Sequence, residues 1–374
     1  MELVNGTRFS LDVTQSLDKD GRMWVVAIAK ATYAFPCAGD HAARLAPRQT
    51  GLLVSDVFEA EAGLSTPHFE SDLAPFKRLC DVVVKGTAHA PSDKAVRELI
   101  ARVKVGAIDK AVRVVGERSW VSRAGRYRPG DPAPFTAIPV TYGRAFGGMW
   151  DGRDFGDAED FVVYAANPIG RGYAPGRYRK LLEGARTPNV EAIDDPIRDP
   201  EGGHTPVSFG PVARNWTPRR NYAGTYDAEW RDSIYPLLPP NFDDRFYQCA
   251  PDDQQIPYPR GAELVNLWNL TTNGHVEFRL PALDLPMVVV LRDRSQVVLS
   301  PVVDTLAIDA DAELFDVVWR ARLPVRRGLV DLRLVAAGSV CKRWWRSQLY
   351  GSGDCGCGGF EVDDKDLLSV TEMV

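Results

Sequence analysis

Arginine and aromatic side chains are concentrated between residues 216 and 246, and this combination can bind a partner. Arginine pairs with carboxylates through two parallel hydrogen bonds, and aromatic rings supply contact area at little cost in side-chain entropy. Protein interfaces and single-stranded nucleic-acid grooves both use these residue types. Interspersed acidic residues neutralise the local charge and favour internal ion pairs or a protein partner. The side chains that we predict to contact a partner are Arg144, Trp216, Arg219, Arg220, Tyr222, Tyr226 and Trp230.

The same stretch has a purely structural alternative, in which its large rings fix a long loop to the rest of the protein. Trp216, Tyr226 and Trp230 are the residues for which this alternative matters most. Replacing an interface residue by alanine weakens a complex, whereas replacing a buried ring lowers folding stability.

Adjacent acidic residues are the second group with chemical potential. They occur at Asp194-Asp195, Asp243-Asp244, Asp252-Asp253 and Asp363-Asp364. Glycoside hydrolysis uses two carboxylates, so a carbohydrate-active enzyme or carbohydrate-binding module is the alternative interpretation of the aromatic and acidic segment. Acidic pairs beside proline are more often turns and caps, and the sequence has no nucleophile elbow, phosphate loop or His-Glu-x-x-His motif. We therefore predict no catalytic residue and no enzyme.

Cysteine usage bounds the metal and redox chemistry. Cys355-Gly-Cys357 lies in a glycine-rich stretch, and Cys341 could add a third sulfur. A structural zinc site needs about four ligands, and no second ligand pair accompanies these residues, so we predict no metal and no other cofactor. Six cysteines among 374 residues are too few for a disulfide scaffold, which favours reduced thiols.

Charge and hydropathy exclude two further classes of partner. The chain has 45 basic and 50 acidic residues, a net charge of -5, which argues against nucleic acid. Its longest apolar runs, such as residues 24–29 and 161–166, are far shorter than the roughly 18 residues of a membrane-spanning helix. Because the first residues do not resemble a signal peptide, we expect a cytoplasmic protein.

The elements that must position these residues are mostly strands. Apolar and β-branched runs predict strands at 23–35, 287–291, 296–299, 305–308, 315–323 and 329–336. Alternation at 101–105 and 112–114 predicts one hairpin, and Asn273-Gly274 within 264–280 predicts another. The few helix candidates are 93–99 and 363–368. We predict a mainly β protein (β-rich α+β) with antiparallel, sandwich-like lobes.

The middle of the chain has a different composition. Residues 167–260 hold 14 of the 27 prolines, which disfavours long helices and ladders, while their 12 aromatic residues argue against a flexible linker. We predict a long, ordered, irregular Pro/Arg/aromatic segment packed on a β scaffold. The predicted division is a β-rich part at 1–150, this irregular segment at 151–262, β hairpins at 263–340 and a partly flexible Cys/Gly tail at 341–374.

Several spaced motifs occur over roughly residues 22–285. The motifs are Lys30-Ala-Thr-Tyr, Glu70-Ser-Asp-Leu-Ala-Pro, Asp81-Val-Val-Val-Lys-Gly-Thr-Ala, Gly116-Glu-Arg-Ser-Trp120, Pro139-Val-Thr-Tyr-Gly-Arg-Ala-Phe-Gly-Gly148, Asn167-Pro-Ile-Gly-Arg-Gly-Tyr173, Phe209-Gly-Pro through Trp216, Pro218-Arg219, Ala223-Gly-Thr-Tyr-Asp227, Trp230, Pro239, Phe242-Asp243 and Ala250-Pro-Asp-Asp-Gln254. In these motifs the chain resembles the bacterial family catalogued as domain of unknown function 2169, associated with type VI secretion systems. At Glu117 the family more often has Asp.

The resemblance implies a cytoplasmic adaptor or chaperone. Such a protein holds an effector with a PAAR-like tip domain and aids its loading onto the VgrG spike. The family has no agreed catalytic residues to transfer to this chain. The identity of the effector, the stoichiometry and any step of adaptor release do not follow from the sequence.

Overall fold

Strands dominate the computed structural model, which describes residues 1–37, 40–151, 153, 161–341, 345 and 367–369. Strands account for 42% and helical turns for 11% of the structure, so the mainly β prediction is confirmed. The helix expected at 93–99 is wrong: Ser92 and Asp93 have φ near +54° and +53°, which an α-helix does not accept, and a strand begins at Glu98. Of the second candidate, residues 363–366 lie outside the described residues, and Leu367–Ser369 form a strand.

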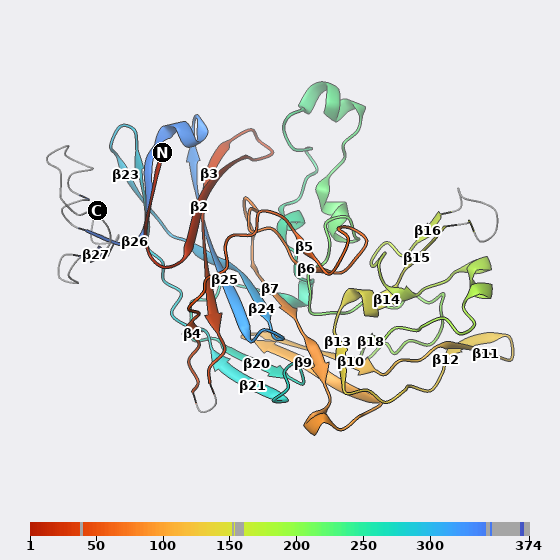
Figure 1. Ribbon diagram of the computed structural model, residues 1–374. Helices are drawn as coiled ribbons and strands as arrows, with labels where there is room; N and C mark the ends of the chain where they lie inside the picture. The colour runs from red at the N-terminus through yellow and green to blue at the C-terminus, as the bar shows by residue number, and fades with distance from the viewer. Residues whose placement is uncertain (38–39, 152, 154–160, 342–344, 346–366, 370–374) are drawn as a thin grey trace.

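A seven-stranded central sheet forms the middle of the protein (Figure 1). The strand order is β19 (Gln255–Ile256), β7 (Cys80–Lys85), β24 (Val302–Asp309), β25 (Leu314–Val325), β3 (Met23–Ala34) and β2 (Ser10–Leu17), with β4 (Arg44–Leu45). Only its β7–β24 pair is parallel, and β4 pairs with β3 at one end. β3 is buried on both faces, which explains its long run of apolar residues.

Two five-stranded sheets accompany the central sheet. The terminal sheet orders β1 (Glu2–Gly6), β26 (Leu332–Cys341), β22 (Met287–Leu291) and β23 (Gln296–Leu299), with β27 (Leu367–Ser369) paired to β26. The hairpin sheet orders β18 (Val190–Ala192), β10 (Ile108–Val115), β9 (Glu98–Val105), β20 (Leu264–Trp268) and β21 (His275–Arg279).

The predicted hairpins are present in these sheets. β9 and β10 form an antiparallel pair in which Val105 and Ile108 lie opposite each other next to the turn, and β22 pairs with β23. β20 and β21 also pair, although Asn273-Gly274 ends a six-residue connection, 269–274, instead of forming a two-residue turn. Gly274 has φ +76°, the conformation for which glycine is favoured.

One hydrophobic core joins all three sheets into a sandwich-like body. Phe278 of the hairpin sheet contacts Phe35 and Phe315, with ring centroids 4.9 and 5.2 Å apart. Trp319 of the central sheet stacks on Phe9 at 5.3 Å, and its indole N–H donates to the Leu283 carbonyl. The outer face of the terminal sheet buries a separate apolar cluster that includes Trp345.

A smaller lobe between residues 117 and 204 has its own core, built around Trp120, Phe146, Tyr178 and Leu182 (Figure 1, right). Its short strand pairs are β11 (Trp120–Arg123) with β12 (Arg126–Pro129), β14 (Phe146–Gly147) with β17 (Arg171–Gly172), and β15 (Met149–Asp151) with β16 (Phe161–Val163).

The remaining elements are short. Two further pairs are β5 (Val57–Phe58) with β6 (Pro67–Phe69) and β8 (Thr87–His89) with β13 (Ala137–Pro139). The helical turns are η1 (Pro91–Asp93), η2 (Tyr142–Arg144), η4 (Gly176–Leu181), η5 (Arg219–Ala223), η6 (Trp230–Ile234), η7 (Asp244–Tyr247), η8 (Asp252–Gln254) and η9 (Gly328–Asp331).

The sheets draw strands from distant parts of the chain. The central sheet combines β3 and β7 with β19 from the irregular segment and β24 from the C-terminal hairpins. The terminal sheet pairs the first strand in parallel with β26. The body is therefore assembled from segments on both sides of the predicted boundaries.

The aromatic contact between the sheets gives a first prediction. Phe278→Ala should lower the free energy of unfolding by about 3–5 kcal/mol, because it opens a cavity where the central and hairpin sheets meet. Ile100→Ala is the matched control, since Ile100 lies in the same sheet with 42% of its surface exposed and should cost less than about 1 kcal/mol. Urea denaturation measures both values, and similar losses for the two variants would contradict this packing.

Candidate partner-binding site

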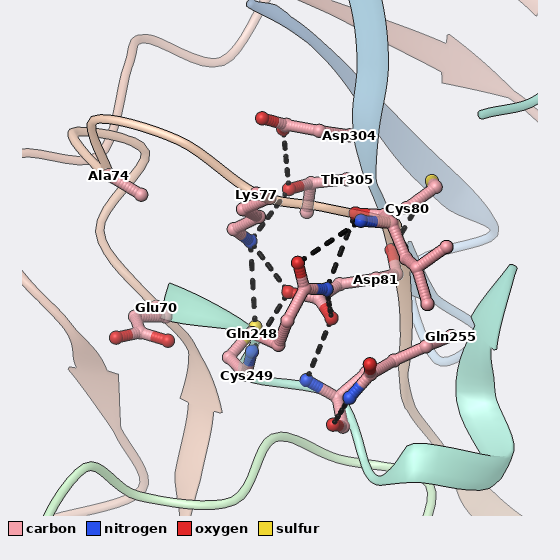
Figure 2. A network of polar contacts seen from close by, with 12 residues as sticks. Glu70, Ala74, Lys77, Cys80, Asp81, Gln248, Cys249, Gln255, Asp304 and Thr305 are labelled. Atoms are coloured by element: carbon pink, nitrogen blue, oxygen red, sulfur yellow. Dashed lines mark hydrogen bonds and ion pairs between the residues drawn. The ribbon is translucent and has the colours of Figure 1, made fainter. Parts of the chain in front are cut away.

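The second part of the irregular middle segment, residues 193–262, is held to the central sheet mainly by side chains. Its one strand in that sheet, β19, has two residues and pairs with β7. The remaining attachment centres on Asp81 of β7, which is fully buried. Its carboxylate accepts hydrogen bonds from Gln248 Nε2 at 2.8 Å and from the backbone N–H groups of Cys249 at 2.8 Å and Ala250 at 3.2 Å (Figure 2).

Lys77 balances the charge of Asp81 inside the protein. Its Nζ lies 2.8 Å from Asp81 Oδ2 and also donates to Thr305 Oγ1 at 2.9 Å, as Figure 2 shows. Burial by itself lowers the pKa of Lys77, but the adjacent Asp81 outweighs burial and raises this pKa above its ordinary value. The lysine is therefore charged. Its ion pair with Asp81 connects β7 to the loop that precedes this strand, and its hydrogen bond to Thr305 connects the same loop to β24.

A second buried amide ties the end of the segment to the same strand. Gln254 donates from Nε2 to the carbonyls of Val82 and Phe209, at 2.7 and 2.9 Å. Its Oε1 accepts from Lys110 Nζ at 2.8 Å, and Lys110 also contacts Asp253. The Phe209 carbonyl also accepts from the Val84 backbone N–H, so Gln254 and this backbone bond together join the segment to β7.

Arg219 anchors the middle of the segment. Its guanidinium contacts Glu70 at 2.7 Å and donates to the carbonyls of Val212 and Phe246, both at 2.8 Å. Arg214 contacts the same carboxylate. Burial raises the pKa of Glu70, but the two arginines, Arg219 first, outweigh burial and hold this pKa below its ordinary value.

Two of the predicted contact residues are buried, which corrects the prediction for them. Trp216 is 1% exposed and packs edge-to-face on Tyr142, with centroids 5.4 Å apart. Arg219 is 4% exposed and engaged as described above. Both have almost no surface to offer a partner, so they support the segment and are left out of the contact surface.

Residues 224–241 form an aromatic projection that rises from the body (Figure 1, top). Trp230 is its centre: the indole N–H donates to the Leu237 carbonyl at 2.8 Å, and the ring contacts Tyr226 and Tyr235 edge-to-face at 4.7 and 5.7 Å. Tyr226 is 52% and Tyr235 69% exposed. The projection therefore presents two large rings to solvent on a fixed indole.

The base of the projection carries two more predicted residues. Arg220 is exposed, and Tyr222 is half-buried with the Arg245 guanidinium 4.2 Å from its ring centroid. Arg245 also contacts Asp243 at 2.8 Å. Tyr222 and Arg245 border a pocket of about 220 Å³ that Pro218 and Gln255 also line.

Arg144 lies apart from this group, in η2 at the edge of the small lobe. Its guanidinium contacts Glu117 at 3.0 Å and Asn189 Oδ1 at 3.1 Å. Within the described part of the chain no side-chain hydrogen bond or ion pair joins it to the aromatic projection. The structure thus brings together Arg220, Tyr222, Tyr226 and Trp230 as accessible residues, and not Arg144.

The acidic pairs of the sequence have structural partners. Asp243 accepts hydrogen bonds from Arg245, which lower its pKa to about 2. Burial raises the pKa of Asp195, but a hydrogen bond from His204 outweighs it and leaves this pKa below its ordinary value. A glycosidase acid requires a raised pKa, so neither carboxyl is suited to that task. Asp363-Asp364 lies outside the described residues.

The described residues also bear on metal binding and on membrane insertion. Among the described residues no group of three or more His, Cys, Asp or Glu side chains could hold a metal ion, while Cys355 and Cys357 lie outside them. Cys37, Cys80 and Cys249 carry free thiols. No described helix has the length and hydropathy needed to cross a membrane.

The residues that sequence reasoning missed are the anchors. Asp81, Lys77, Gln248 and Glu70 make the contacts that fix the segment, yet none stood out as a candidate site. The apolar run that follows Asp81 could have identified it. This run predicts a buried strand, and a carboxylate at the start of a buried strand requires hydrogen-bond donors from elsewhere in the protein. Tyr235 was also missed as an exposed ring.

The Asp81 network gives a second prediction. Asp81→Asn should lower the free energy of unfolding by about 3–5 kcal/mol, because it leaves the buried Lys77 charge without its counter-ion. Asp309→Asn is the control, since it breaks the better exposed Lys85–Asp309 pair and should cost about 1 kcal/mol or less. Equal losses in urea denaturation would show that Asp81 has no special role.

The lowered pKa of Glu70 gives a third prediction. Ionised Glu70 stabilises the fold above its usual pKa of 4.5, and this stabilisation disappears as the pH falls through the lower pKa of the folded state. The stability advantage of the wild type over Glu70→Gln should therefore be full near neutral pH and shrink on acidification. Unfolding free energies across that range measure it, and a constant difference between the two proteins counts against the Glu70–Arg219 pair.

Comparison with known proteins agrees with the resemblance. No curated protein and no solved structure matches the chain. The family model described as "Uncharacterized protein conserved in bacteria (DUF2169)" matches residues 20–320. This range includes the hairpin sheet, most of the central sheet, β22 and β23 of the terminal sheet, the small lobe and the aromatic projection. Because this match covers well over half of the sequence, the chain belongs to that bacterial family.

Proposed function

We propose that this protein is a non-enzymatic, cytoplasmic adaptor of a type VI secretion system. It binds an effector that carries a PAAR-like domain and aids loading of that effector onto the VgrG spike. The proposal rests on the resemblance of the sequence motifs, and the aromatic projection is the structural observation that supports it most.

The projection has the chemistry of a protein-binding surface. Tyr226 and Tyr235 expose large rings, and Trp230 fixes both of them, so little side-chain entropy is lost when a partner covers the rings. Exposed Arg220 adds donors for carboxylates of the partner. Interfaces are enriched in these three residue types.

The base of the projection suits the same task. Arg219, Asp81 and Gln254 hold the surrounding chain by buried contacts, so the projection is presented from a fixed base. A preorganised surface binds more tightly than one that must order on contact. This arrangement explains why so many prolines, arginines and rings are used where no long strand or helix forms.

Substitution of the exposed rings tests the proposal. The double variant Tyr226→Ala/Tyr235→Ala should weaken co-purification with an effector that carries a PAAR-like domain, by about 1–4 kcal/mol in binding free energy. Its melting temperature should stay near that of the wild type, because both rings are exposed. Phe161→Ala is the control, since Phe161 is equally exposed but belongs to the small lobe.

Two outcomes contradict this proposal. Full co-purification of the double variant would remove the projection from the interface. Binding of soluble glycans by the wild type, lost in the same double variant, would favour the carbohydrate-binding alternative instead.

A further inference from the structure

A pocket of about 340 Å³ lies beside the base of the aromatic projection. It is enclosed by the turn between β2 and β3, by residues 75–76 and by residues 238–247. Its lining includes Lys19, Arg22, Trp24, Phe76, Tyr247 and Arg322. Aromatic and cationic side chains from four separate parts of the sequence thus meet at one hollow.

Arg322 of β25 is held between two rings in this pocket. Its guanidinium carbon lies 3.9 Å from the Phe76 ring centroid and 4.4 Å from the Trp24 centroid. Trp24 is itself fixed, because its indole N–H donates to Asp18 Oδ2 at 2.9 Å. Stacking on the two rings orients the guanidinium without using its N–H donors, which lie in the guanidinium plane.

The donors of Arg322 have no partner among the residues that the structure describes: no hydrogen bond or ion pair is formed by this side chain there. Arg320, two residues earlier on the same strand, differs sharply. It is buried, contacts Asp304 and donates to the carbonyls of Asp72 and Ala74. Arg320 thus has a structural role, whereas Arg322 is oriented and accessible with its donors unused.

In the described structure, none of the three aspartates that line the pocket forms an ion pair or hydrogen bond with Arg322. Asp18 accepts from Trp24 and from the backbone N–H groups of Asp20 and Arg22. Asp244 lies 3.5 Å from Arg78. Asp20 is exposed at the turn and, in the described structure, makes no contact with Arg322. Lys19 and Arg22 add positive charge to the same lining.

We infer that this pocket binds an aspartate or glutamate side chain of the partner protein, with Arg322 as the residue that recognises the carboxylate. The inference rests on the proposed adaptor function and names the chemistry of a second contact beside the projection. A carboxylate fits the edge of a guanidinium bidentately, and the stacked rings have already fixed the orientation of this one.

The position of the pocket favours an acidic side chain of the same partner. The β2–β3 turn lies against the projection. A Cβ atom placed on Gly21 of this turn would be 3.6 Å from the Leu237 side chain, which is an ordinary van der Waals distance. Leu237 is also the residue whose carbonyl accepts the Trp230 indole hydrogen bond. A protein that covers Tyr226 and Tyr235 therefore approaches the pocket, where Arg322 can take a carboxylate from it.

The first experiment needs no partner. The arginine Nε–H signals of the ¹⁵N-labelled full chain are followed by NMR during titration with acetyl-Glu-Glu-Glu-amide, and Arg322→Lys identifies the Arg322 signal. A saturable shift of that signal, absent with acetyl-Gln-Gln-Gln-amide, is the expected result. No shift, or the same shift with the glutamine peptide, overturns the carboxylate site.

The second experiment measures affinity for the effector. Arg322→Ala should weaken binding about 10- to 100-fold, the effect of losing charge-assisted hydrogen bonds. Arg322→Lys should recover only part of it, because an ammonium group cannot bind bidentately. Arg326→Ala is the control, an exposed arginine outside the pocket that should bind like the wild type.

The two arms separate the two proposals. If Tyr226→Ala/Tyr235→Ala weakens the complex but Arg322→Ala binds like Arg326→Ala, the adaptor function stands and the carboxylate site is wrong. If neither the wild type nor any variant forms a complex with the effector, the adaptor function fails. The NMR titration still decides whether Arg322 binds carboxylates.

Discussion

The buried carboxylate of Asp81 is the constraint on which the rest of the structure depends. A charge in the protein interior must be paired and hydrogen-bonded, and Asp81 satisfies this requirement with Lys77 and with donors from residues 248–250. Those donors follow Asp81 by nearly 170 residues in the sequence. One side chain therefore fixes where the irregular segment returns to the central sheet, and the projection that precedes this point is positioned with it.

The irregular segment divides its residues between anchoring and presentation. Trp216, Arg219 and Gln254 are buried. Arg219 and Gln254 donate to backbone carbonyls, and Trp216 packs on Tyr142. Tyr226 and Tyr235 are exposed to solvent, and each ring packs edge-to-face against the indole of Trp230. Buried ion pairs hold this irregular backbone in place where neither a helix nor a long strand does so.

Much of the fold follows from the sequence, because alternation reports local burial. The β9–β10 hairpin is visible in Ala101, Val103 and Val105 alternating with charged residues. The helix expected at 93–99 was wrong because left-handed backbone at Ser92 and Asp93 ends the turn, which composition does not reveal. In the site, Trp216 and Trp230 occur in the same proline-rich stretch, yet Trp216 is buried and Trp230 is partly exposed. Which ring is buried depends on partners far away in sequence, such as Tyr142, and no local pattern encodes them.

The central claim is that the aromatic projection and the adjoining Arg322 pocket together contact the effector. Hydrogen–deuterium exchange of the protein, free and in complex with an effector that carries a PAAR-like domain, tests this most directly. The account predicts that binding slows exchange in residues 224–241 and in the β2–β3 turn, while the outer face of the hairpin sheet is unchanged. Slowed exchange confined to the hairpin sheet or the small lobe, with the projection unaffected, would contradict the account.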